Sequence, residues 1–386
     1  MTGQGLDAVI TGIGCTRFGR QPGVPVENLA LTACQNAIQD AGLTPRQIDG
    51  LVSYHVNDSV QSRDLAPALG LAELNWWSDT SAGGTFSCAA IAEAAMVVSA
   101  GMARAVVVYR ALRGRSGQRP GQYRGSLTGG VHQFMTPFGF SSAAQIFGMV
   151  CRRHMAEFGT TKEQLGAVAL AEREHARLNE RAMCRDELTL ADYLSARVIA
   201  DPYSLFDCCQ ETDGACAVVV SRPGATGPGP HPPVRIRAAV HGGGPVPRLP
   251  FDGWPSFTCS VFRRLAPVLY ERAGITARDV DVALLYDAFT FEVIQQLEDF
   301  GFCGLGEGGP FAAAGNIRLG GTIPVNPHGG LLSEAYIHGL NHIVSAVEQL
   351  RGEAGPRQVP GAAIALVTGF GFSAGSAMIL AGADAA

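Results

Sequence analysis

The sequence predicts an α/β protein built from two similar halves, and two observations carry this prediction. Short β-branched and apolar runs alternate with amphipathic stretches of helical length, the pattern of strands covered by helices. The alternation restarts after residues 222–233 (RPGATGPGPHPP), whose proline and glycine content supports neither a helix nor a central strand. We therefore expect an N-terminal half over 1–221, a linker over 222–233 and a C-terminal half over 234–386.

The elements of the first half follow in order. The run 8–11 predicts the opening strand, and 26–41 predicts an amphipathic helix that ends before Gly42. The stretch 87–100 predicts a helix whose many alanines suit deep burial, and the apolar run 105–109 predicts a strand covered on both faces. The other elements expected here are a strand at 50–54, helices at 143–158 and 161–177, and a strand at 215–221.

Three segments are expected to be loops. Residues 110–136 are rich in Gly, Ser, Gln and Arg without clear periodicity, so we expect an extended loop over the active site. This loop would form the first part of a loop region of about 110–205 within the first half. The loops 134–142 and 242–257 are expected to shape a binding pocket.

The second half repeats the plan of the first. Its expected strands lie at 234–240, 280–286, 362–368 and 376–380, and its expected helices at 261–273, 291–300 and 340–351. The repeat agrees with the position of the linker, which supports a duplicated architecture.

Composition excludes several classes of protein. The 386 residues are 47% hydrophobic with a net charge of −5, which gives a large core and no nucleic-acid footprint. No run of 18 apolar residues is free of charge, Gly or Pro, so we expect no membrane span, and the polar start does not suggest a signal peptide. Ten cysteines without a C-x-x-C pair indicate reduced thiols in a cytoplasmic protein, with no structural metal.

The segment 326–339 (NPHGGLLSEAYIHG) is the first candidate site. It predicts a strand end, a turn at Gly329-Gly330 and a helix start, with Tyr336 and His338 at the mouth. Paired glycines let backbone pass close to a ligand, and a helix N-terminus presents free N–H groups to an anion.

Tyr286 and Asp287 form the second candidate site, because they follow an apolar strand. The carboxyl end of a buried strand is where ligand sites form in α/β proteins. A strand end that merely faces solvent is the alternative for these residues taken alone. Paired with Tyr336, they become the strongest site in the sequence.

Four other motifs have ordinary structural explanations. G-x-S-x-G at 371–375 lacks the following helix and later histidine of a hydrolase, and G-x-G-x-x-G at 304–309 does not follow a strand. Cys88 lies in the alanine-rich helix, where a small buried thiol is common. For 207–214 we favour a turn in which Asp213 caps backbone N–H groups.

The whole chain, from residue 8 to about 380, resembles the thiolase superfamily, in particular its lipid-transfer-protein-like branch. Residues 205–215 (LFDCCQETDGA) resemble the thiolase SDGAAA segment, 286–289 (YDAF) stand where thiolases carry NEAF or HDCF, and 369–375 stand where they carry C-x-G-G-G-x-G. The resemblance implies a thiolase fold, with two duplicated α/β halves in five layers, an inserted loop domain and at least a dimer.

Departures from the thiolase pattern decide the chemistry that the resemblance implies. The position of the acylated cysteine holds Gly84, and that of the C-terminal acid/base cysteine holds Gly369. Tyr286 replaces the asparagine of NEAF, and Tyr336 replaces the histidine of the GHP triplet. Claisen chemistry through an acyl-cysteine is therefore lost, and two phenols stand where the thioester oxygen would be bound.

This combination is similar to the actinobacterial steroid side-chain retro-aldolases. The motifs are YDxFT at 286–290, N-x-HGG…EAYIHG at 326–339 and DCCQETDGA at 207–215. The resemblance implies cleavage of a β-hydroxyacyl-CoA steroid side chain to a 17-ketosteroid and propionyl-CoA. It also implies a small partner that joins a zinc ribbon to an OB fold, a homodimer core within a heterotetramer, and no cofactor besides the CoA of the substrate.

Within that resemblance, Tyr286 and Tyr336 are the expected base and acid, in an order that the sequence leaves open. A free phenol has a pKa of about 10, so one phenol should have a lowered pKa. The candidate causes are His328, His338 and backbone dipoles at Gly329-Gly330.

Asp287 is expected to support the site by orienting a phenol or a histidine. Lys162, the single lysine, leaves little scope for a Schiff base, and the thioester is already an electron sink. Gly84 and Gly369 are expected to leave room for a steroid ring. The residues expected to bind substrate are Gly84, Gly329, Gly330, Gly369 and Gly371.

Three alternatives stay open at this point. Loss of both cysteines would also suit a non-catalytic subunit that binds acyl-CoA or scaffolds a partner. A Claisen-type acyltransferase could use Cys88 or another thiol. A structural subunit could be active only in complex with the zinc-ribbon partner.

Overall fold

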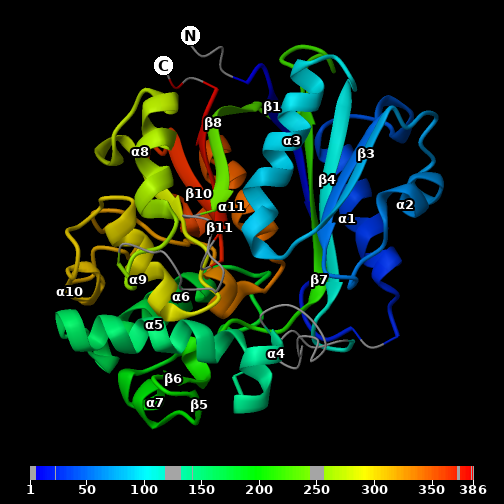
Figure 1. Cartoon of the computed structure of the whole chain (residues 1–386). Helices are drawn as coiled ribbons and strands as arrows, with labels where there is room; N and C mark the ends of the chain where they lie inside the picture. Colours follow the sequence, from blue (N-terminus) through cyan, green and yellow to red (C-terminus); the bar gives the residue numbers. More distant parts are fainter. Residues whose placement is uncertain are drawn as a thin grey trace.

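A computed structural model describes residues 6–21, 23–117, 132–140, 142–243, 256–371, 374–383 and 385. Figure 1 shows strands in two groups with helices between them and outside them. The strands of the first half are β1 (Val9–Cys15), β2 (Gly50–His55), β3 (Trp76–Ser81), β4 (Ala105–Arg113) and β7 (Asp213–Ser221). Those of the second half are β8 (Val234–Gly243), β9 (Val282–Leu284), β10 (Ile364–Phe370) and β11 (Ala374–Ala381).

The helices follow the same division. The first half contains α1 (Val26–Asp40), α2 (Ser62–Leu69) and α3 (Ser87–Ser99), and the second contains α8 (Phe262–Ala273), α9 (Thr290–Asp299), α10 (Gly308–Ala313) and α11 (Leu340–Arg351). Between β4 and β7 the chain inserts α4 (His132–Met135), α5 (Ala143–Phe158), α6 (Lys162–Arg177), α7 (Leu190–Ser195), β5 (Val198–Ala200) and β6 (Tyr203–Ser204).

The strand order confirms the predicted duplication. Along the sheet it is β3-β2-β4-β7-β1-β8-β11-β10-β9, which is nearly a mirror image about the β1–β8 junction. On each side of the junction two antiparallel pairings are followed by a parallel one, β4–β2 in the first half and β10–β9 in the second. The junction is short, since only Val9 and Ile10 pair with β8.

Five layers result from this arrangement, as the resemblance implied. Helices α3 and α11 contact strands of both halves and form the central layer, while α1 covers β1, β7 and β4 and α8 covers β8 and β11 (Figure 1). The alanine-rich sequence of α3 suits this position, because Ala90, Ala94 and Ala95 are fully buried and allow close approach of strands on two sides.

The expected loop over 110–136 is wrong at both ends. Residues 110–113 continue β4, because its ladder with β7 runs on to the pair Arg113–Asp213. Residues 132–135 form α4, and the middle of the segment lies outside the described residues. Parts of both expected pocket loops, 134–142 and 242–257, also lie outside the described residues.

The expected helix start at Gly329-Gly330 is also wrong. Residues 330–334 form one π-helical turn, and α11 begins only at Leu340. Both glycines have positive φ, +104° and +62°, which turns the chain sharply at this point. The amides of Ser333 and Glu334 donate to the Gly329 carbonyl. This turn is therefore not the N-terminus of a long helix, and the expected dipole is missing.

Strand β9 is shorter than the predicted 280–286. Its parallel ladder with β10 covers only Val282 to Leu284. Beyond it the chain leaves the sheet, and Leu285 offers its carbonyl to the side chains of Asn326 and His342. Among the described residues no helix is long and apolar enough to cross a membrane.

Candidate active site

Two tyrosines predicted from distant parts of the sequence meet directly. The hydroxyl of Tyr286 donates a hydrogen bond to the hydroxyl oxygen of Tyr336 over 3.0 Å. The ring planes are inclined by 70° with centroids 6.5 Å apart, so the rings do not stack face to face. Tyr286 is buried and Tyr336 is half-buried. The structure thus brings together the proposed acid and base.

Backbone hydrogen bonds fix Tyr286 just past the end of β9. Its amide donates to Thr368 Oγ1 over 2.8 Å, and its carbonyl accepts from Gln296 Nε2 over 2.7 Å. Thr368 in turn donates to Gln296 Oε1 over 2.6 Å, which closes a ring of three residues. The phenol is therefore held from β10 and α9 at once.

Tyr336 is held from the first half of the chain. Its amide donates to Thr212 Oγ1 over 3.0 Å, just before β7 begins. The preceding Ala335 is extended, which carries the chain out of the π turn. The site is therefore assembled from both halves, because Thr212 and Tyr336 come from opposite sides of the linker.

Burial raises the pKa of both phenols, so the expected lowered tyrosine pKa is wrong. For each tyrosine the loss of hydration is the largest cause. The hydrogen bond acts in opposite directions: it raises the pKa of the donor Tyr286 and lowers that of the acceptor Tyr336. Both phenols are neutral near neutral pH.

The two histidines that were expected to lower a tyrosine pKa are themselves neutral. Burial and then the neighbouring His342 lower the pKa of His328, which contacts His342 across 3.2 Å rather than either tyrosine. His338 does lie beside Tyr336, with ring centroids 4.8 Å apart. Burial and the Arg110 cation lower the pKa of His338 to about 3.

The glycines at the two former cysteine positions leave no open room. A Cβ on Gly84 would lie 2.1 Å from the Tyr286 hydroxyl oxygen. A Cβ on Gly369 would lie 2.2 Å from Ser87 Oγ and 2.5 Å from the Gly84 carbonyl oxygen. The expected space for a steroid ring is therefore wrong at these positions, because the phenol and the neighbouring backbone fill it.

The remaining glycines of the predicted site are also packed. A Cβ would approach Ala176 within 2.6 Å at Gly329, Asp287 within 2.2 Å at Gly330, and Thr85 within 2.4 Å at Gly371. Their contacts here are with the protein itself, and a role in substrate binding stays a prediction.

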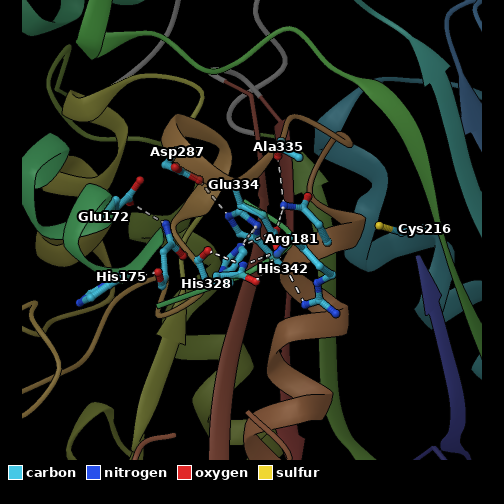
Figure 2. A network of polar contacts seen from close by, with 12 residues as sticks. Glu172, His175, Arg181, Cys216, Asp287, His328, Glu334, Ala335 and His342 are labelled. Atoms are coloured by element: carbon cyan, nitrogen blue, oxygen red, sulfur yellow. Dashed lines mark hydrogen bonds and ion pairs between the residues drawn. The ribbon is translucent and has the colours of Figure 1, made fainter. Parts of the chain in front are cut away.

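Asp287 orients a histidine, as predicted. Its Oδ1 lies 2.9 Å from Nε2 of His342, and its Oδ2 accepts from the amide of Leu332 over 3.0 Å. Figure 2 shows this contact within a buried polar network that continues through His328. Asp287 thus ties α11 to the π turn, and among the described residues it has no hydrogen bond with either phenol.

The network extends into the inserted region and to the surface. Asn326 donates to Glu172 on α6 over 2.8 Å, and Asn179 donates to Glu334 over 2.8 Å. Glu334 lies 3.7 Å from Arg181 (Figure 2). Arg181 also pairs with Glu348 on α11. These contacts fasten the π turn to α6 and α11.

Sequence reasoning missed Arg110, Asp58, Thr212 and His342. Arg110 is fully buried within β4, and its guanidinium contacts both Asp58 and His338. A charged residue directly after the apolar run 105–109 was the available signal, since the carboxyl ends of buried strands point toward ligand sites. Nothing in the sequence distinguished His342 from the other residues of its predicted helix.

The motifs given ordinary explanations are structural. Cys88 donates its thiol to the Val367 carbonyl, and burial raises its pKa to about 12, so it is no acylation nucleophile. Asp213 caps the amides of Gln21, Arg115 and Ser116, as predicted. All ten cysteines are free thiols.

The other two motifs have no catalytic geometry. Gly371 follows β10 and its amide donates to the carbonyl of Ala374, the first residue of β11; Phe372 and Ser373 lie outside the described residues. Residues 304–309 form a turn that enters α10.

Comparisons with known proteins agree with this geometry. A family model described as thiolase C-terminal domain-like matches residues 249–381. A Mycobacterium tuberculosis protein named 17-hydroxy-3-oxo-4-pregnene-20-carboxyl-CoA lyase is 40% identical over 359 residues, which cover 89% of this chain and 92% of that protein. A steroid side-chain-cleaving aldolase of Thermomonospora curvata is 39% identical over 354 residues, or 89% and 90% of the two chains.

Solved structures give the same result. A structure described as an Ltp2-ChsH2(DUF35) aldolase superposes with a TM-score of 0.92 at 38% identity and covers 98% of both chains. Human mitochondrial 3-ketoacyl-CoA thiolase superposes with a TM-score of 0.71 over 97% of this chain and 98% of that one. At 13% identity that second likeness supports the fold alone.

Fold and site together define a member of the thiolase superfamily in which two paired phenols occupy the centre of the site. Glycines stand where the resemblance places both thiolase cysteines. Within the superfamily the chain belongs to the family of steroid side-chain-cleaving aldolases. It is a carbon–carbon lyase of the aldolase type and not a cysteine-dependent thiolase.

Proposed function

We propose that this protein cleaves a β-hydroxyacyl-CoA steroid side chain by a retro-aldol reaction, releasing a 17-ketosteroid and propionyl-CoA. The contact between Tyr286 Oη and Tyr336 Oη carries the proposal, because it places two proton-carrying groups 3.0 Å apart. The Mycobacterium tuberculosis relative is named for a substrate with a 17-hydroxyl and a 20-carboxyl-CoA. In such a substrate the hydroxyl is β to the thioester carbonyl, as a retro-aldol cleavage requires.

The reaction balances without any oxidant, water or metal. The proton of the β-hydroxyl leaves, and its O–H electron pair becomes the second bond of the new ketone. The bond between the α and β carbons breaks, and its electron pair passes to the thioester as an enolate. Protonation of the α carbon then gives the shorter acyl-CoA. CoA is part of the substrate, and we propose no resident cofactor.

A relay through two neutral phenols accounts for both proton transfers. Tyr286 donates to Tyr336 in the resting structure. In the proposed relay the proton transfers accompany C–C cleavage in one concerted shift. The substrate hydroxyl gives its proton to Tyr286 as the C–C bond breaks, Tyr286 passes its own proton to Tyr336, and Tyr336 gives its proton to the α carbon. Tyr286 is thus the base and Tyr336 the acid, and neither must exist as a free phenolate, in agreement with their raised pKa values.

We further propose that the protein works with a small partner of zinc-ribbon and OB-fold architecture, around a homodimeric core and in the cytoplasm. The solved relative described as an Ltp2-ChsH2(DUF35) aldolase supports a partner of the DUF35 kind. Any zinc would belong to that partner.

The test is a product assay on the purified protein with and without the DUF35-type partner. β-Hydroxyacyl-CoA esters of cholesterol, phytosterol and bile-acid side chains are incubated with each preparation. Chromatography with mass detection should find a steroid ketone and propionyl-CoA in equal amounts. If none of the esters yields a ketone in the presence of the partner, that result contradicts the proposal and favours a non-catalytic subunit.

A further inference from the structure

We propose that His338 is a catalytic hydrogen-bond donor, whose neutral imidazole presents Nε2–H to the thioester oxygen as negative charge develops there. Arg110 and Asp58 are positioning residues that hold the ring in this form. The inference rests on the proposed retro-aldol reaction and adds a third group to it. It replaces the expected role of His338 as a neighbour that lowers a tyrosine pKa.

A chain of two hydrogen bonds fixes the tautomer of His338. Arg110 Nε donates to His338 Nδ1 over 3.0 Å, and Arg110 Nη2 donates to Asp58 Oδ2 over 2.6 Å. A guanidinium only donates hydrogen bonds and stays charged in proteins. Nδ1 must therefore be the acceptor, and the single hydrogen of the neutral ring must lie on Nε2.

Burial makes this arrangement rigid. The side chain of Arg110 is completely buried and that of Asp58 is 15% exposed. Arg110 also donates through Nη1 to the Ala111 carbonyl over 2.5 Å. The guanidinium is therefore held by three acceptors, and its direction toward Nδ1 is set before substrate binds.

The backbone of His338 is held in a strained form. Its φ of +50° is unusual for a residue with a side chain. The Tyr54 hydroxyl donates to the His338 carbonyl over 3.0 Å and keeps the turn in place. Such strain persists where the surrounding structure fixes it, and it occurs at ligand sites more often than elsewhere.

The ring of His338 lies beside the tyrosine pair. The rings of His338 and Tyr336 meet edge to face at 88°. A Cβ on Gly83 would come 3.9 Å from Cε1 of His338, and the next residue, Gly84, lies against the Tyr286 hydroxyl. Among the described residues Nε2 of His338 has no hydrogen-bond partner. A donor is thus available beside the residue that would protonate the enolate.

The charges around His338 explain why a neutral ring is preferred. Arg110 is the cation in contact with it, Asp58 lies behind Arg110, and the phenols of Tyr54 and Tyr336 are uncharged neighbours. An imidazolium here would face the guanidinium directly. A neutral N–H can stabilise an enolate oxygen without surrendering its proton to it.

Kinetics of two His338 variants test the donor. His338→Phe removes Nε2–H and should lower kcat by about 10²- to 10³-fold, the usual loss for one oxyanion donor. His338→Gln keeps an N–H near the Nε2 position and should recover part of that loss. Thermal unfolding checks that both variants fold. Full kcat in His338→Phe, in a preparation where wild type is active, would overturn the inference and leave the proposed function standing.

Nitrogen-15 NMR of histidine-labelled protein tests the tautomer independently of activity. The signals missing from the His338→Gln spectrum identify those of His338. The His338 ring should be the neutral Nε2–H form and should not titrate between about pH 5 and 8. Arg110→Met should raise the pKa of His338 toward that window, because burial remains but the cation that opposes protonation is gone and Asp58 favours it. An Nδ1–H tautomer, or ordinary titration in wild type, would overturn the inference. If no steroid ester is cleaved at all, this measurement still decides the state of His338.

Asp58→Asn supplies a gentler variant should Arg110→Met not fold. It should lower kcat severalfold with His338 still neutral, because Arg110 keeps its charge but loses an anchor. The matched control is Asp40→Asn, which removes an acceptor from the equally buried Arg351 at 2.9 Å. It should lower stability without changing kcat. Equal kcat in Asp58→Asn and wild type would remove Asp58 from the proposal.

Discussion

The hydroxyl of Tyr286 lies directly against Gly84. A Cβ on Gly84 would be 2.1 Å from the phenol oxygen and 2.3 Å from two ring carbons. Real Cβ atoms do not approach other atoms so closely, so a side chain at 84 and the observed position of Tyr286 exclude each other. The two departures from the thiolase pattern are therefore physically one change: the phenol fills the place from which a cysteine would have acted.

Gly84→Ala tests this dependence. The added methyl group should displace the Tyr286 hydroxyl by at least an ångström and lower kcat by about 10²-fold. Overpacking of the core should also cost about 1–3 kcal/mol of stability. Steady-state kinetics and urea unfolding measure both effects. Gly83→Ala, whose Cβ would come no closer than 3.9 Å to the nearest side chain, should do less harm on both measures. Equal kcat in Gly84→Ala and wild type would contradict the proposed position of the phenol.

Removal of either phenol should stop the relay. Tyr286→Phe and Tyr336→Phe should each lower kcat by at least about 10²-fold, the usual worth of general acid–base catalysis. The double variant should be little worse than either single one, because one missing proton carrier already breaks the chain. Tyr270→Phe is the matched control, since its hydroxyl donates to the Phe300 carbonyl far from the site. Near-full activity in either single variant would remove that tyrosine from the mechanism.

Local sequence patterns predicted the elements well, because each depends on neighbours in the chain. The helices at 143–158 and 340–351 have the predicted bounds. The motifs containing Tyr286 and Tyr336 also led to the pair that the fold brings together. Their protonation was predicted wrongly, because burial sets it and burial comes from the whole fold.

Contacts between distant residues could not be predicted in the same way. Arg110 and His338 are separated by 228 positions, and the fold brings β4 beside the loop before α11. Neither residue lies in a motif that names the other. The π turn over 330–334 was missed for a related reason: Asp287 and Asn179, from distant segments, hold Leu332 and Glu334 in place.

The relay predicts a rate that barely depends on pH. Both phenols have raised pKa values and His338 has a pKa of about 3, so none of the three changes protonation between about pH 6 and 9. A mechanism based on a phenolate would instead gain about tenfold in kcat per pH unit below the phenol pKa. Saturating rates across that range, with wild-type stability checked at each pH, separate the two. A steep rise with pH would contradict the neutral relay.

Turnover should survive alkylation of thiols. Cys88 is buried and burial raises its pKa to about 12, so iodoacetamide should react with it slowly, and turnover should not depend on its thiol. Cys88→Ala should keep kcat within about twofold while costing on the order of 1 kcal/mol of stability, as expected for a small core deletion. Rapid loss of activity that Cys88→Ala prevents would instead support a Claisen-type acyltransferase.

Glu172 makes stability depend on pH in a direction that can be checked. Its Oε1 accepts from Asn326, and its Oε2 has no hydrogen-bond partner within the described part of the chain. A Cβ on Gly330 would lie 2.5 Å from that oxygen and 2.2 Å from Asp287 Oδ2, so the two carboxylates are close together. Burial, followed by the charge of Asp287, raises the pKa of Glu172 well above 4.5. The folded state therefore binds this proton more tightly than the unfolded state.

The contribution of protonated Glu172 to stability is complete below the pKa that Glu172 has in the unfolded chain. It is lost as the pH rises through the higher pKa that Glu172 has in the folded protein. Glu172→Gln keeps the acceptor for Asn326 and adds an N–H toward Asp287, as the protonated acid does. Thermal unfolding should therefore find Glu172→Gln more stable than wild type at about pH 8 and equal to it at about pH 4.5. Glu174→Gln, an exposed change on the same helix, should shift stability by no more than about 0.5 kcal/mol at either pH. A Glu172→Gln protein that is less stable than wild type at both pH values would show that Glu172 is an anion in the folded state.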